Sequence, residues 1–202
     1  MPFILIVVKA SLRNPKLQLK NMKPQNYTTH ALLTLLLLLS FRLTGQHDSA
    51  AGTPEDKLKI ASRDIIASAN TCALITLDKE GSPRVRMMDP FPPEEDFTIW
   101  FGTNADSRKV AQIRNDPRVN LYFPAADHSG YVTINGTAQL IEDQKEKEKR
   151  WKAAWEEFYP AYPEGYMLIK VTPVRMEVVS YRHGIVGDTV TWEPPALLFG
   201  TE

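Results

Sequence analysis

The chain has 202 residues, of which 43% are hydrophobic and 24% charged, a composition typical of a soluble globular protein with a proper core. Residues 1–45 hold six of the 24 cationic side chains and no carboxylate, so the rest carries 18 basic against 24 acidic groups, a net charge of −6. Such an acidic body argues against a general nucleic-acid binder, and we expect no nucleic-acid partner.

The N-terminal part resembles an export signal. From Met22 onward, Lys23 supplies a positive start, residues 31–39 an apolar run, and small residues precede a polar segment. This order is typical of a secretory signal peptide, and the apolar run is shorter than the about 20 residues that span a bilayer. We predict a signal peptide over 1–45, export to the periplasm or the cell exterior, and no stable membrane insertion after cleavage. An uncleaved anchor is the alternative.

The start of the chain needs a separate interpretation. Residues 1–21 match neither the signal pattern nor a folded segment, and we interpret them as a misplaced upstream start, with Met22 as the true one. Residues 46–52 are polar and are predicted to be a linker. The folded domain is predicted over 53–202.

The domain opens with a helix and continues mainly as strands. Thr53 precedes a proline and two acids, which indicates a capped helix start, and helical spacing of apolar residues continues to about Ala69. Alternating or apolar runs then predict strands at 71–77, 83–88, 97–102, 119–123, 131–141 and 166–181. The tight turn at 79–82 joins the first two strands as a hairpin.

Two further helices are predicted between the strands. Residues 108–115 form a short helix stopped by Asp116-Pro117, and residues 143–158 a longer one. The longer helix places apolar side chains on one face, which we interpret as core: Trp151, Ala154, Trp155 and Phe158. Many strands with short links and few helices predict a mainly β fold, an antiparallel β-barrel with flanking helices.

The histidine and cysteine residues of the sequence give little support for metal or thiol chemistry. The four histidines show no metal-ligand spacing with cysteine or acidic partners, so no metal site is predicted. Cys72 is the only cysteine and has no partner for an internal disulfide. We interpret it as a small buried residue.

The stretch FGTNADSRKV, residues 101–110, gathers hydroxyls and cations between a strand and a helix. Arg84 and Arg86 alternate on the 83–88 strand and share one face, and we expect the 97–101 strand to lie beside it. One of these arginines then approaches the turn, and the convergence predicts a phosphate site. The alternative is that Ser107 only caps the helix and that its neighbouring cations are solvated.

The order of several motifs decides between these alternatives. GSPRVRMM, FTIWFGTN, SRKVAQIRNDPRVNLYF and GYVTINGTAQLI together resemble the pyridoxamine 5′-phosphate oxidase-like superfamily, most closely its FMN-binding general stress protein branch, over most of residues 57–181. The resemblance implies a six-stranded antiparallel split barrel of the FMN-binding type. It also implies a homodimer with FMN bound where two subunits meet.

The resemblance also implies site residues. Arg86, Met87 and Met88 line the flavin and its phosphate in this interpretation, and Gly102 with Thr103 takes the place of a tyrosyl-threonyl pair of the oxidases. The phosphate is held by a Ser-Arg-Lys motif whose members here are Ser107, Arg108 and Lys109. A glutamine that touches the flavin in the oxidases is replaced by Tyr131, so that contact differs.

The C-terminal part departs from the oxidase signature. The oxidase signature is replaced here by Glu177-Val178-Val179 and by the residues from Tyr181 to Gly184. This difference places pyridoxamine phosphate oxidation in doubt. Arg182 and His183 are either substrate groups or part of an ordinary turn, and Trp192 either stacks near the flavin or serves packing. No catalytic residue is predicted.

Two classes of function follow from the resemblance. The first is an FMN-dependent oxidoreductase, in which the flavin supplies the redox chemistry. The second is a protein that stores, carries or senses flavin, haem or a related tetrapyrrole without turnover. FMN is the expected cofactor, and haem or a deazaflavin are the alternatives.

Overall fold

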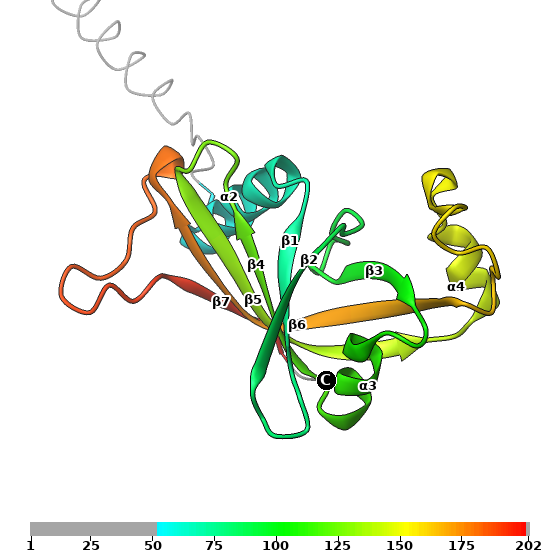
Figure 1. Cartoon of the computed structure of the whole chain (residues 1–202). Helices are drawn as coiled ribbons and strands as arrows, with labels where there is room; N and C mark the ends of the chain where they lie inside the picture. Colours follow the sequence, from blue (N-terminus) through cyan, green and yellow to red (C-terminus); the bar gives the residue numbers. More distant parts are fainter. Residues whose placement is uncertain (1–51, 201–202) are drawn as a thin grey trace, which may run out of the picture. The chain divides into compact units, whose positions relative to one another are not determined.

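A computed structural model describes residues 52–200, which fold around one antiparallel sheet (Figure 1). The strands are β1 (Cys72–Leu77), β2 (Pro83–Met88), β3 (Ile99–Asn104), β4 (Arg118–Pro124), β5 (Gly130–Ile141), β6 (Tyr166–Ser180) and β7 (Ala196–Leu198). The helices are α2 (Pro54–Ser68), α3 (Arg108–Asn115) and α4 (Gln144–Lys149), with short 3-10 turns η1 (Ala153–Trp155) and η2 (Tyr181–His183). The predicted signal peptide and linker, up to residue 51, lie outside the described residues.

The strand order is β2-β1-β4-β5-β6-β3, and β7 pairs with β6. The mainly β fold and its split-barrel type are confirmed, and all six predicted strands form. The short seventh strand was not predicted. β1 and β2 form the expected hairpin, with Leu77 opposite Pro83 and the turn tied by hydrogen bonds to the Asp78 side chain.

Helix α2 begins where the sequence predicted. The Thr53 hydroxyl accepts a hydrogen bond from the backbone N–H of Asp56, whose carboxylate accepts one from the N–H of Thr53. This reciprocal pair satisfies two N–H groups that the helix leaves without partners. The apolar face of α2 enters the main core through Ala61, Ile65 and Ile66. That core fills the barrel with fully buried residues of β1, β3, β4, β5 and β6, among them Leu74, Phe101, Leu121, Ile134 and Met176.

The expected neighbour of β2 is wrong. β3 pairs along its length with β6, and its link to the segment after β2 is a single bridge between Pro90 and Phe101. Pro90, Pro92 and Pro93 follow β2 and cannot donate backbone hydrogen bonds, so a ladder between β2 and β3 cannot extend there. The two strands therefore lie on opposite edges of the sheet, and the barrel is split between them.

The long helix predicted over 143–158 is also wrong. α4 ends at Lys149, and the chain continues through turns and η1. Trp151 and Trp155 do pack inward, but Phe158 is exposed. The inward rings join an aromatic cluster on the outer side of β3 and β6, made of Phe91, Trp100, Trp151, Trp155, Tyr159, Tyr162 and Tyr166. A straight helix cannot bring these rings around Tyr166, so tertiary packing overrides the local helical pattern.

Two further observations concern the described part of the chain. No helix within residues 52–200 combines the length and apolar character needed to cross a membrane. Cys72 is fully buried, as predicted, and burial is the main cause that raises the pKa of its thiol to about 12. A thiol in this state is a packing group rather than a nucleophile.

Candidate anion site at the start of helix α3

Three cationic side chains converge between β2 and α3. Arg86 comes from β2, while Arg108 and Lys109 come from the first turn of α3. The two arginines border a depression of about 300 Å³, whose lining residues are Pro83, Arg84, Val85, Arg86, Arg108 and Gln112. Desolvation, followed by repulsion from Arg86 and Arg108, lowers the pKa of Lys109. Desolvation and then Arg108 lower the pKa of Arg86. The predicted approach of one arginine to the turn is therefore present, although β3 does not lie beside β2.

Within residues 52–200, these three cations form no ion pair with a carboxylate. Every ion pair found within residues 52–200 involves other side chains, including one between Arg84 and Asp78 that holds Arg84 on the surface. Mutual repulsion among Arg86, Arg108 and Lys109 is thus uncompensated in the described part of the chain. An anion in the depression would relieve it.

The hydroxyls belong to the same site. Nζ of Lys109 donates a hydrogen bond to Oγ1 of Thr103 at 2.9 Å, and Oγ of Ser107 lies 3.4 Å from the same atom. Ser107 occupies the N-cap position of α3, but its side chain makes no capping hydrogen bond. The first backbone N–H groups of α3 have no intrahelical acceptors and point toward its N-terminal end. The capping-only explanation of Ser107 is therefore not supported.

Two polar residues that the sequence analysis missed hold Arg86. Its Nη1 donates to Oγ1 of Thr76 at 2.7 Å and to the carbonyl oxygen of Leu74 at 3.3 Å, and its Nη2 donates to Oε1 of Gln112 at 2.8 Å. Gln112 stands four residues after Arg108 on α3, and this spacing on one helix face was the available signal. Thr76 is fully buried on β1, and only the strand pairing reveals its role.

The remaining predicted residues lie elsewhere. Met87 is 60% exposed and lies on the outer face of the sheet, opposite to the face that carries Arg86. Met88 packs against the main core. Tyr131 lies in a separate depression of about 290 Å³ with Tyr122 and Tyr181. Within one chain, the structure does not bring Met87, Met88 or Tyr131 together with the three cations.

Gly102 has a packing role on the outer side of β3. A Cβ atom at this position would lie 2.5 Å from Cζ3 of Trp155 and 2.6 Å from the hydroxyl oxygen of Tyr166. The Tyr166 hydroxyl donates to the carbonyl oxygen of Arg150 at 2.6 Å, so the ring cannot move without breaking that bond. The missing side chain therefore makes room for the aromatic cluster.

We expect Gly102→Ala to destabilise the fold by about 1–3 kcal/mol, because overpacking forces rigid rings out of place. Urea unfolding checks this value. A variant of unchanged stability but altered flavin affinity would instead support the cofactor contact implied by the resemblance.

The candidate residues near the C-terminal end, His183 and Trp192 among them, are separate from the anion site. His183 in η2 lies between two partners, with Nδ1 2.8 Å from Oγ of Ser180 and Nε2 3.0 Å from Oδ2 of Asp64 on α2. These contacts tie η2 to α2, which favours the structural turn over a substrate group. Trp192 is 78% exposed, so it is not a packing residue within the described chain. No group of three or more metal-ligating side chains occurs among residues 52–200.

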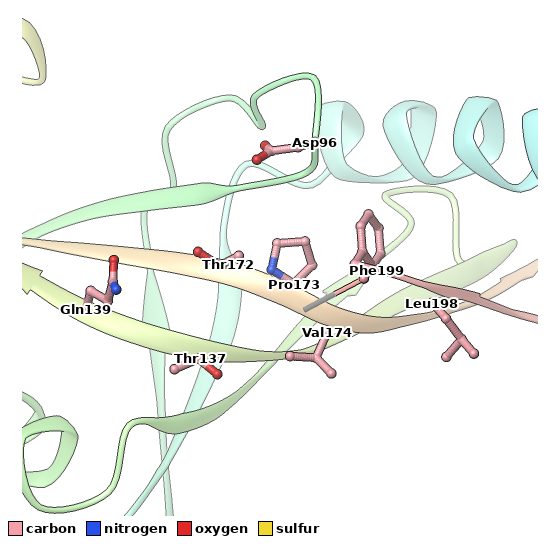
Figure 2. Close-up of a pocket in the computed structure, with 9 residues that line it drawn as sticks. Asp96, Thr137, Gln139, Thr172, Pro173, Val174, Leu198 and Phe199 are labelled. Carbon is pink, nitrogen blue, oxygen red and sulfur yellow. The ribbon is translucent and has the colours of Figure 1, made fainter. Parts of the chain in front are cut away.

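A concavity of about 710 Å³ within residues 52–200 is an open groove where β5 and β6 bend (Figure 2). Thr137 and Gln139 come from β5, Thr172 to Val174 from β6, and Leu198 and Phe199 from the C-terminal end. Its one charged lining residue is Asp96, which already accepts hydrogen bonds from the N–H and hydroxyl of Thr98. This groove does not suit an anion.

The split barrel and the cluster of Arg86, Arg108 and Lys109 indicate the class of protein: a split-barrel protein with a site suited to an anionic group. A family model described as pyridoxamine 5′-phosphate oxidase matches residues 58–180, more than half of the chain. The chain belongs to this family, so the predicted resemblance is confirmed. Pyridoxine/pyridoxamine 5′-phosphate oxidase of Blochmanniella floridana is 34% identical over 86 residues, which cover 42% of this chain and 38% of that relative.

Solved structures show the same fold. General stress protein 26 of Bacillus anthracis is 24% identical, with a TM-score of 0.54 over 72% of this chain and 98% of that one. A protein related to general stress protein 26 from Clostridium acetobutylicum is 19% identical, with a TM-score of 0.59 over 71% and 95% of the two chains. The general stress protein branch is thus represented among the structural relatives.

Proposed function

We propose that this protein binds FMN, with the phosphate in the anion site at the start of α3, and acts as a flavin-dependent oxidoreductase. The observation that carries the proposal is the convergence of Arg86, Arg108 and Lys109 without a carboxylate partner in the described chain. The match to the pyridoxamine 5′-phosphate oxidase family supports it.

The donors present suit a phosphate monoester. Such a phosphate carries close to two negative charges at neutral pH and prefers charge-assisted donors. Lys109 supplies a point charge, Arg108 a planar fork, and the N-terminal end of α3 its free N–H groups. When bound, FMN would supply the redox chemistry, and the chain would supply binding and orientation.

Spectroscopy tests the proposal directly. Purified protein titrated with FMN should show the shifted absorption bands of a bound flavin, and a reduced nicotinamide cofactor should bleach them by transferring its hydride to the flavin. Bound flavin that no reduced nicotinamide cofactor bleaches would point to a flavin carrier. A red protein with a Soret band that does not take up FMN would contradict the proposal and favour a tetrapyrrole ligand.

A homodimer is part of this proposal. The outer face of the sheet is continuous from β2 through β1, β4, β5 and β6 to β7, because Val85, Ile75, Asn120, Asn135, Arg175 and Leu198 are successive cross-strand partners. Several large apolar side chains on this face are exposed, including Met87, Tyr122 and Leu198. A surface that mixes exposed large apolar side chains with polar ones in this way is typical of a protein interface. A second copy covering it would also bring Met87 and Tyr131 into contact with that copy.

Export is also proposed, on the pattern of residues 22–45. Protein isolated from its native host should begin near Gln46. Mass spectrometry of the intact protein checks the mass of the mature chain. Protein that retains the N-terminal segment and is recovered from the cytoplasm would contradict export.

A further inference from the structure

Arg86 is locked in a closed ring of hydrogen bonds. Its Nη1 donates to the Thr76 hydroxyl and its Nη2 to Oε1 of Gln112, while the Thr76 hydroxyl donates to the same Oε1 at 2.7 Å. Thr76 is fully buried, and Gln112 lines the depression that Arg86 and Arg108 border. The ring joins β1, β2 and α3, so the guanidinium is held by three separate elements.

The ring leaves part of Arg86 free. A guanidinium has five N–H donors, and the bonds to Leu74, Thr76 and Gln112 occupy three of them. The two left, on Nε and Nη2, match the two-pronged donor that binds phosphate and carboxylate oxygens. An anion can therefore bind without displacing any member of the ring.

All three acceptors of Arg86 are neutral: a carbonyl oxygen, a hydroxyl and an amide oxygen. A carboxylate is the commoner partner for a half-buried arginine, because it compensates the charge that burial isolates. Here a carboxylate would cancel the positive charge and repel an incoming anion. A neutral acceptor orients the guanidinium and keeps its charge available.

We propose that Gln112 is a positioning residue that orients Arg86 through a neutral acceptor and thereby preserves the charge of the anion site. This inference rests on the proposed function, since it concerns the same site. It adds that a neutral side chain at position 112 keeps the affinity for the anion high.

Gln112→Glu separates this role from a merely structural one. Glutamate has the same length and keeps an acceptor oxygen for both Arg86 and Thr76, and it adds an ion pair with Arg86. We expect unchanged or higher thermal stability together with at least tenfold weaker FMN binding and unchanged riboflavin binding. A structural role predicts that FMN affinity follows stability and is therefore kept.

A second variant and a control complete the test. Gln112→Met removes the acceptor without adding charge, so its FMN affinity should fall between those of the wild type and Gln112→Glu. Gln144→Glu makes the same charge change on the surface helix α4 and should leave FMN affinity within twofold of wild type. Isothermal calorimetry with FMN and riboflavin, combined with thermal melts, measures all four proteins.

The outcomes distinguish this inference from the proposed function. A wild type that binds neither FMN nor inorganic phosphate overturns both. A wild type that binds FMN, with Gln112→Glu binding it equally well, overturns only the role of Gln112. Weakening by Gln112→Met equal to that by Gln112→Glu also overturns the claim that charge at this position decides affinity.

Discussion

Replacing Lys109 by alanine should weaken FMN binding by roughly ten- to a hundredfold and leave riboflavin binding unchanged. The Lys109 ammonium is half-buried, bonded to the Thr103 hydroxyl and repelled by two arginines, so it gains most from an incoming dianion. One charge-assisted hydrogen bond contributes about 1.5–3 kcal/mol, which corresponds to this loss of affinity. Calorimetric titration with both ligands measures the difference, because riboflavin lacks the phosphate.

A matched lysine provides the control. Lys59 pairs with Glu55 on the surface of α2, outside the site, and Lys59→Ala should bind both ligands as the wild type does. Equal weakening of FMN and riboflavin by Lys109→Ala would remove this stretch from the phosphate site. Added FMN should also raise the melting temperature of the wild type more than that of the variant, since ligand binding stabilises only the folded state.

Replacing Leu198 by aspartate should abolish the proposed dimer. Leu198 is 76% exposed on β7, borders the groove of Figure 2 and lies in the outer face that a second copy would cover. Arg175, the cross-strand partner of Leu198, is already paired with Glu177 and Glu193, so the new carboxylate would have no cation of its own. A carboxylate buried without a partner in such an interface costs about 3 kcal/mol or more, which corresponds to over a hundredfold weaker association. Light scattering should then give the mass of one chain. FMN affinity should fall as well if two subunits share the flavin site.

Ile60→Asp is the matched control for this variant. Ile60 is also exposed, but it lies on α2 rather than on the outer face of the sheet. We expect it to remain dimeric. A wild type that is monomeric and still binds FMN tightly would contradict the shared site, while leaving the phosphate contacts of α3 intact.

The local elements were predictable because their signals are local. Thr53 and Asp56 are three residues apart and form their capping pair within one turn. The 79–82 turn determines which residues of β1 and β2 lie opposite each other. The cluster of Ser107, Arg108 and Lys109 is likewise contiguous, so the anion site could be suspected from ten residues.

The partners of these elements were less predictable. One of Arg84 and Arg86 was expected to approach the turn before α3, but from a pairing of β2 with β3 that does not occur. The real route runs through β1, whose Thr76 joins Arg86 to Gln112 of α3. Gly102 shows the same limit, because the rings that exclude a side chain there belong to residues 53 and 64 positions further along the chain.

The amino-acid sequence alone located the six longer strands, two of the helices and the contiguous part of the anion site, because periodicity, turn residues and caps act over a few bonds. The order of its motifs also identified the family. The pairing of the strands, the packing of the aromatic segment and the neutral groups that hold Arg86 became evident only from the three-dimensional fold. Those outcomes depend on contacts between residues far apart in the chain, where burial and close packing outweigh local preference. Gln112 is the clearest case: its sequence spacing places it on the right face of α3, and only the fold brings Arg86 to it.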